Sequence, residues 1–223
     1  MSNIKDHSRE TKTLTTIIEK PLIQLLVKKM PSKITPDILT AIGLFGALLT
    51  GLGYYLSNYN AIYLWLSSFG LIVNWFGDSL DGSLARYRHI ERPKYGFFID
   101  HSIDSVTMIV IAIGAGLSPY ARFDYVLLAL IGYLLMSILV YLNIFVTGVF
   151  KISFYNLGPT EMRLLIILLN TAVFFFGVGQ FQIKGIEFTI FDLTAVLLAV
   201  ILFLIFLISI IVIARRLNHE EKK

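Results

Sequence analysis

The chain has 223 residues, of which 56% are hydrophobic and only 15% charged, and its formal net charge is +4. Its mean hydropathy of +0.75 excludes an ordinary soluble domain, in which about 45–50% of residues are apolar. The absence of cysteine excludes disulfides, thiolate metal sites and cysteine nucleophiles. We therefore expect an all-α, polytopic membrane protein, whose positive charge favours anionic lipid headgroups over nucleic acid as partners.

Residues 1–33 are predicted to form a cytoplasmic N-terminal segment. Their apolar stretch is interrupted, unlike the core of a signal peptide, so we expect them to be retained. Within "TTIIEKPLIQLLVKKMP", apolar side chains lie near one helical face and lysines near the other. This pattern predicts an amphipathic helix on the membrane surface. The alternative is a solvated helix packed against the protein.

Six stretches are long enough to cross a hydrocarbon core, which takes roughly 20 helical residues. The second becomes a span only if its helix continues through Asp78 and Asp81. Together the six make one domain over 34–216, followed by a cytoplasmic tail over 217–223. The predicted spans are 36–57, 61–85, 96–118, 123–149, 160–180 and 189–214.

The distribution of basic residues predicts the orientation, because Lys and Arg accumulate in cytoplasmic loops. Seventeen of the nineteen Lys and Arg residues fall at the chain ends or beside the second and fourth connections, whereas Arg122 and Lys184 fall on the other side. We therefore expect both termini in the cytoplasm.

Four aspartates interrupt this apolar chain within residues 77–104, "GDSLDGSLARYRHIERPKYGFFIDHSID". Asp78 and Asp81 are three residues apart and Asp100 and Asp104 four, so each pair lies on one helical face. Two helices joined by a short loop are antiparallel neighbours, so the two faces can meet near the cytoplasmic surface. An uncompensated charge at membrane depth costs at least about 2.5–3.5 kcal/mol. Oxygen ligands of this kind favour Mg²⁺ or Mn²⁺ as the compensating ions.

Small residues continue the first of these faces. Gly82 and Ala85 keep side-chain bulk away from it, at a cost for glycine of about 1 kcal/mol in helix propensity. Arg86 adds a guanidinium suited to phosphate. The pattern predicts a metal-bound pyrophosphate with a base or sugar lying against the small residues.

These residues, with Gly96, resemble the signature of the CDP-alcohol phosphotransferase family. Eight identities recur in order: Asp78, Asp81, Gly82, Ala85, Arg86, Gly96, Asp100 and Asp104. The resemblance implies transfer of a substituted phosphate from a CDP-linked alcohol to another hydroxyl, release of CMP, two metal ions and a homodimer. Asp78, Asp81, Asp100 and Asp104 are then the metal ligands.

The same resemblance implies more specific roles for some of these residues. Asp104 becomes the general base as well as a ligand, which agrees with the expected chemistry of a carboxylate one turn beyond another ligand. The implied nucleotide and pyrophosphate site consists of Asp81, Gly82, Ala85 and Arg86. The stretch "ITPDILTAIG" is similar to the family's Pro-Asn-x-x-Thr stretch, with Asp37 where asparagine is usual.

Two alternatives come from other classes of protein. A membrane prenyltransferase also binds Mg-diphosphate through aspartate-rich helices, but usually has more than six spans. An ion transporter with intramembrane carboxylates gives no reason for Gly82, Ala85 and Arg86.

The sequence does not specify which alcohol is linked to CDP in the donor or which alcohol is the acceptor. The run "FIDHSIDS" resembles choline and ethanolamine phosphotransferases, and Ser105 after the last aspartate argues against a phosphorylated acceptor. CDP-diacylglycerol with a polar alcohol and a CDP-aminoalcohol with a lipid both stay open. The candidate acceptor-pocket residues are His101, Lys151, Glu161 and Arg163.

Overall fold

A computed structural model describes residues 16–147, 159–183 and 185–222 of the chain. A single 3-10 turn, Ala61–Tyr63, precedes α3. The described helices and strands are, in order, α1 (Thr16–Lys29), α2 (Pro36–Leu56), α3 (Leu64–Tyr87), α4 (Pro93–Gly116), α5 (Phe123–Thr147), α6 (Pro159–Phe176), β1 (Gln180–Ile183), β2 (Ile186–Thr189) and α7 (Ile190–Glu220).

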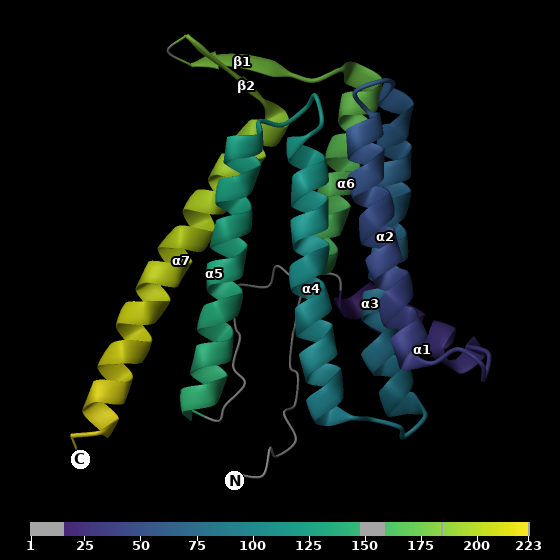
Figure 1. Ribbon diagram of the computed structural model, residues 1–223, viewed down its shortest axis with the longest axis vertical. Helices are drawn as coiled ribbons and strands as arrows, with labels where there is room; N and C mark the ends of the chain where they lie inside the picture. The colour runs from purple at the N-terminus through teal and green to yellow at the C-terminus, as the bar shows by residue number, and fades with distance from the viewer. Residues whose placement is uncertain (1–15, 148–158, 184, 223) are drawn as a thin grey trace.

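The long helices run side by side along the molecule (Figure 1). The largest interface joins α2 to α3, α6 packs on α3, α4 packs on α2, and α5 pairs with α7. The shorter α1 lies across one end of this bundle, against α3. The architecture is predominantly helical, as the composition predicts.

Five helices in the described part of the chain are long and apolar enough to cross a membrane: α2, α4, α5, α6 and α7. The helix α3 continues through Asp78 and Asp81, as a second span requires. It is not among the five, because these carboxylates and Asn74 lower the hydropathy of its second half. The count of six spans therefore stays a prediction.

Two predicted boundaries need correction. The fifth predicted span, 160–180, is too long, because α6 ends at Phe176 and Gly177 takes the left-handed conformation, φ 77°, that terminates helices. The chain then forms an antiparallel hairpin of β1 and β2, with Gln180 opposite Thr189, which the sequence analysis does not predict. The last helix runs to Glu220, into the predicted tail.

Glycines allow α2 and α3 to meet backbone to backbone. A Cβ atom on Gly46 would lie 2.3 Å from the backbone nitrogen of Asn74, and one on Gly77 would lie 2.3 Å from the backbone nitrogen of Gly43. Both distances are too short for any side chain. The small-residue run in α2 therefore serves helix packing, as in many membrane helix pairs.

Replacing Gly77 with alanine should consequently destabilise the protein by about 1–3 kcal/mol, because the new methyl group forces two backbones apart. Gly96→Ala is the matched control, since a Cβ there meets nothing within 4 Å. Thermal unfolding in detergent measures the effect. Equal unfolding temperatures for the two variants would contradict the close approach of α2 and α3.

The helix α1 and the connection after it are both fixed to the bundle. Val27, 3% exposed, packs in a cluster with Leu39, Leu80 and Leu84. Arg88, just after α3, donates hydrogen bonds to four backbone carbonyls of the connection between α1 and α2, those of Met30, Pro31, Ser32 and Ile34. The predicted N-terminal helix is thus present, and its position on a membrane surface stays a prediction.

Candidate active site

One pocket is lined by all four aspartates of the sequence motif. Its lining residues come from α2, α3 and α4. The two aspartate pairs therefore meet at one pocket. The expected direct packing of α3 on α4 is not among the main helix contacts, because both helices pack on α2. The other lining residues are Thr40, Gly43, Leu44, Asn74, Ile103 and Thr107.

Asp78 pairs with a cation from a distant helix. Nη2 of Arg163, in α6, lies 2.7 Å from Oδ2 of Asp78, and its Nε donates to the Asn74 side chain at 2.9 Å. The two partners of the ion pair are 13% and 25% exposed. Arg163, predicted for an acceptor pocket, thus borders the aspartates themselves.

Asp81 is oriented by a hydroxyl group. Thr40 of α2 donates to Oδ2 of Asp81 at 2.7 Å, and the Asp81 side chain also accepts from the backbone N–H of Gly82. Threonine thereby fixes one carboxylate oxygen without adding charge. Thr40 ends the Pro-x-x-x-Thr stretch noted in the sequence, which is the signal that could have identified its role.

The unusual Asp37 of that stretch takes a different partner. Its carboxylate pairs with Arg92 just before α4, and both side chains are about half exposed. This contact joins the start of α2 to the start of α4 and leaves Asp37 outside the pocket lining.

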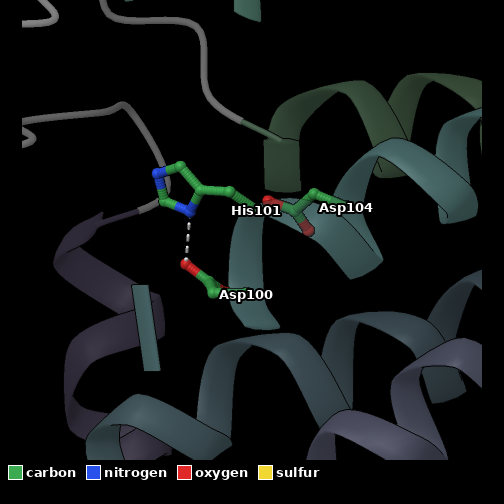
Figure 2. A group of neighbouring side chains, drawn as sticks. All are labelled: Asp100, His101 and Asp104. Carbon is green, nitrogen blue, oxygen red and sulfur yellow. Dashed lines mark ion pairs between the residues drawn. The ribbon is translucent and has the colours of Figure 1, made fainter. Parts of the chain in front are cut away.

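Asp100 and Asp104 share their turn of α4 with His101 (Figure 2). Nδ1 of His101 lies 3.2 Å from Oδ2 of Asp100, and ligand atoms of the three residues all lie within 4.8 Å of one another. The His101 ring also packs on Phe97 and Tyr141, with ring centroids 4.1 and 5.4 Å apart. An imidazole therefore joins a group that the sequence analysis assigned to carboxylates alone.

The small-residue part of the motif lies beside the pocket. A Cβ on Gly82 would lie 3.4 Å from Nη1 of Arg86, so the guanidinium lies over this glycine. Arg86 is exposed and its Nη2 donates to the Ser83 hydroxyl at 3.2 Å. Neither Gly82, Ala85 nor Arg86 lines the pocket of the four aspartates.

The sequence around these residues matches a known protein family. The sequence profile described as CDP-alcohol phosphatidyltransferase matches residues 33–214. The chain belongs to this family. The family resemblance inferred from the aspartate motif is confirmed, and together with the apolar helices it makes the chain an integral, multi-pass membrane protein.

Two relatives share parts of this sequence. Archaetidylinositol phosphate synthase of Pyrococcus horikoshii is 34% identical over 120 residues, which cover 54% of this chain and 61% of that protein. Cholinephosphotransferase 1 of Danio rerio is 25% identical over 169 residues, covering 71% of this chain and 43% of that protein. The matches therefore span less than two thirds of either relative.

One remaining candidate acceptor residue lies at the start of α6. Glu161 is half-buried in the first turn, next to Thr160. Lys151 lies outside the described residues, so its prediction is untested.

Glu19 is a residue near the site that the sequence analysis missed. Its Oε1 accepts hydrogen bonds from Trp75 at 2.8 Å, Ser79 at 3.2 Å and Thr160 at 2.9 Å. It thereby connects α1 to α3 and α6 beside Asp78. The available signal was an acidic residue in the first turn of an otherwise basic helix.

Proposed function

We propose that this chain is a phospholipid-biosynthesis enzyme. It transfers a substituted phosphate from a CDP-linked alcohol to an acceptor hydroxyl and releases CMP. The observation that carries the proposal is the convergence of four aspartates from α3 and α4 on one pocket in a chain of this family. A prenyltransferase or an ion transporter would not account for the family match.

The pocket fits divalent metal ions. Four carboxylates line it and, among its described lining residues, there is no Lys or Arg. Arg163 pairs with Asp78 from outside the lining, and the four carboxylates offer the oxygen ligands that Mg²⁺ and Mn²⁺ prefer. We propose two Mg²⁺ or Mn²⁺ ions held by Asp78, Asp81, Asp100 and Asp104, with His101 close to the second pair.

Bound metal would supply charge neutralisation for the pyrophosphate and the leaving CMP. The chain's own side chains transfer the proton and orient the carboxylates. Asp104 accepts the proton of the acceptor hydroxyl, whose oxygen forms a bond to phosphorus as the bond from phosphorus to the CMP oxygen breaks. Thr40 holds the Asp81 carboxylate in one orientation, which reduces the reorganisation needed during transfer.

The proposed nucleotide site extends from Asp81 to Gly82, Ala85 and Arg86. Two features support this site: Gly82 and Ala85 carry little side-chain bulk, and Arg86 carries a guanidinium group. Because Arg86 is exposed and makes its described contact only with a neutral hydroxyl, it can turn toward a phosphate without breaking an ion pair to another described residue.

The acceptor alcohol is left open by the relatives. One is named for an inositol phosphate lipid and the other for phosphocholine transfer. We propose His101, Glu161 and Arg163 as acceptor-pocket residues, with Lys151 as a further candidate, and either a CDP-diacylglycerol or a CDP-aminoalcohol as donor.

We also propose that both termini and the pocket lie on the cytoplasmic side and that the enzyme is a homodimer. The basic residues of the N-terminal segment and of the α3–α4 loop support this orientation. The dimer rests on family resemblance.

The function is tested by measuring CMP release from purified protein in detergent. Panels of CDP-linked donors and alcohols are combined in the presence of Mg²⁺. We expect CMP with at least one pair, and loss of activity in Asp100→Asn. The matched control is Asp124→Asn, because Asp124 is an exposed carboxylate in the first turn of α5 and does not line the pocket.

Three outcomes would overturn the proposal. They are the absence of CMP from every combination, equal activity in Asp100→Asn and the unaltered protein, and turnover of a prenyl diphosphate with no CDP-linked donor. Ion flux through vesicles without CMP release would favour the transporter instead.

A further inference from the structure

A second groove lies between α1 and the end of α3, separate from the pocket of the aspartates. On α1 it is lined by residues at positions i, i+3, i+4, i+7 and i+8 of one helical face, and on α3 by residues at i, i+3 and i+4. The two stripes face each other. They consist of Lys20, Ile23, Gln24, Val27 and Lys28 on α1 and Ser83, Arg86 and Tyr87 on α3.

The rim of this groove is cationic and its floor is apolar. Lys20, Lys28 and Arg86 are exposed, whereas Val27 is buried and Ile23 half-buried. Within the described part of the chain, none of the three cations forms an ion pair with a carboxylate. Three positive charges and the Ser83 hydroxyl therefore surround one groove, an arrangement that favours a phosphate group.

The face of α1 opposite the groove is apolar and exposed, which favours a position of α1 at the membrane surface. Ile18, Leu22 and Leu25 on that face are 77%, 41% and 51% exposed, and their burial in lipid would be favourable by the hydrophobic effect. The groove also lies where the apolar part of α3 has ended. Phosphates at the level of the lipid headgroups are thus the anions that this groove meets at the highest concentration.

We propose that the groove between α1 and α3 binds the phosphate of an anionic membrane phospholipid, at a site distinct from the catalytic pocket. The phosphate contacts Lys20 and Lys28, the first carbons of the lipid lie on Ile23 and Val27, and Arg86 at the edge of the groove stays assigned to the nucleotide. Since Arg86 also lies over Gly82, an occupied groove adjoins the proposed nucleotide site.

This site needs no divalent metal, because its ligands are cations. Its occupancy can therefore be measured in EDTA, where donor binding to the carboxylate pocket is suppressed. If no lipid binds in the groove, the proposed transferase activity is unaffected. If the protein has no transferase activity, a lipid can still bind in the groove.

Native mass spectrometry of the protein released from detergent in EDTA counts the bound lipids. Phosphatidylglycerol, phosphatidylcholine and soluble glycerol phosphate are titrated separately. We expect phosphatidylglycerol to bind most tightly. In the double variant Lys20→Gln and Lys28→Gln its dissociation constant should rise about 25-fold, because each removed charge weakens binding about fivefold.

The matched control is the double variant Lys29→Gln and Lys94→Gln, which removes the same charge from exposed lysines outside the groove. It should bind phosphatidylglycerol like the unaltered protein. Circular dichroism checks that both variants retain their helices.

Equal weakening in the two double variants would mean general surface attraction and would overturn the proposal. So would phosphatidylcholine binding as tightly as phosphatidylglycerol. Tighter binding of glycerol phosphate than of lipid would identify a soluble phosphate ester as the ligand and would also refute the lipid site.

Discussion

Removal of divalent metal should abolish CMP release, and Mg²⁺ or Mn²⁺ should restore it. The physical reason is the pocket itself, where four carboxylates meet and offer oxygen ligands suited to divalent metal. A pyrophosphate brought to this pocket would add further negative charge. Without metal ions, repulsion should prevent donor binding as well as transfer.

The measurement combines CMP release with calorimetric titration of Mn²⁺ into the protein. Asp78→Asn and Asp100→Asn should each weaken Mn²⁺ binding, and Asp124→Asn should not. Full activity in EDTA, or unchanged Mn²⁺ affinity in both pocket variants, would refute the metal site.

Asp104→Asn should slow transfer by about 10²–10⁴-fold while the CDP-linked donor still binds nearly normally. The amide keeps an oxygen for contact with metal but loses the basic carboxylate that accepts the proton. Asp78→Asn and Asp100→Asn should instead lose donor affinity, because each removes charge from the ion site itself.

Titration of a non-hydrolysable CDP-alcohol against each variant, alongside CMP-release rates, separates these effects. If Asp104→Asn loses donor affinity as severely as Asp78→Asn, Asp104 is chiefly a ligand. The neighbouring His101, 3.2 Å from Asp100, would then become the first group to test as base, through His101→Gln.

The sequence predicted those features that depend on local spacing. The apolar stretches predicted the long helices, and intervals of three and four residues predicted that Asp78 with Asp81, and Asp100 with Asp104, share helical faces. The two pairs reach one pocket because α3 and α4, joined by a short loop, both pack on α2.

Features that depend on packing between distant helices could not be predicted in this way. Arg163 reaches Asp78 across 85 positions, and Glu19 reaches Thr160 across 141. No periodicity within one helix specifies its rotation against another. The hairpin after α6 was missed for a different reason, since its strands have only four residues each and follow an apolar run that resembles a helix.

The glycine contacts make α2 the common support of both halves of the candidate metal site. The helix α3, which carries the first aspartate pair, meets the α2 backbone at Gly46. The helix α4, which carries the second pair, meets the same backbone further along, since a Cβ on Gly114 would lie 2.4 Å from the Cα of Gly51. Neither helix can shift against α2 without backbone contacts that are too short. The separation between the two aspartate pairs is therefore set by α2, the helix that touches both of the helices that carry them.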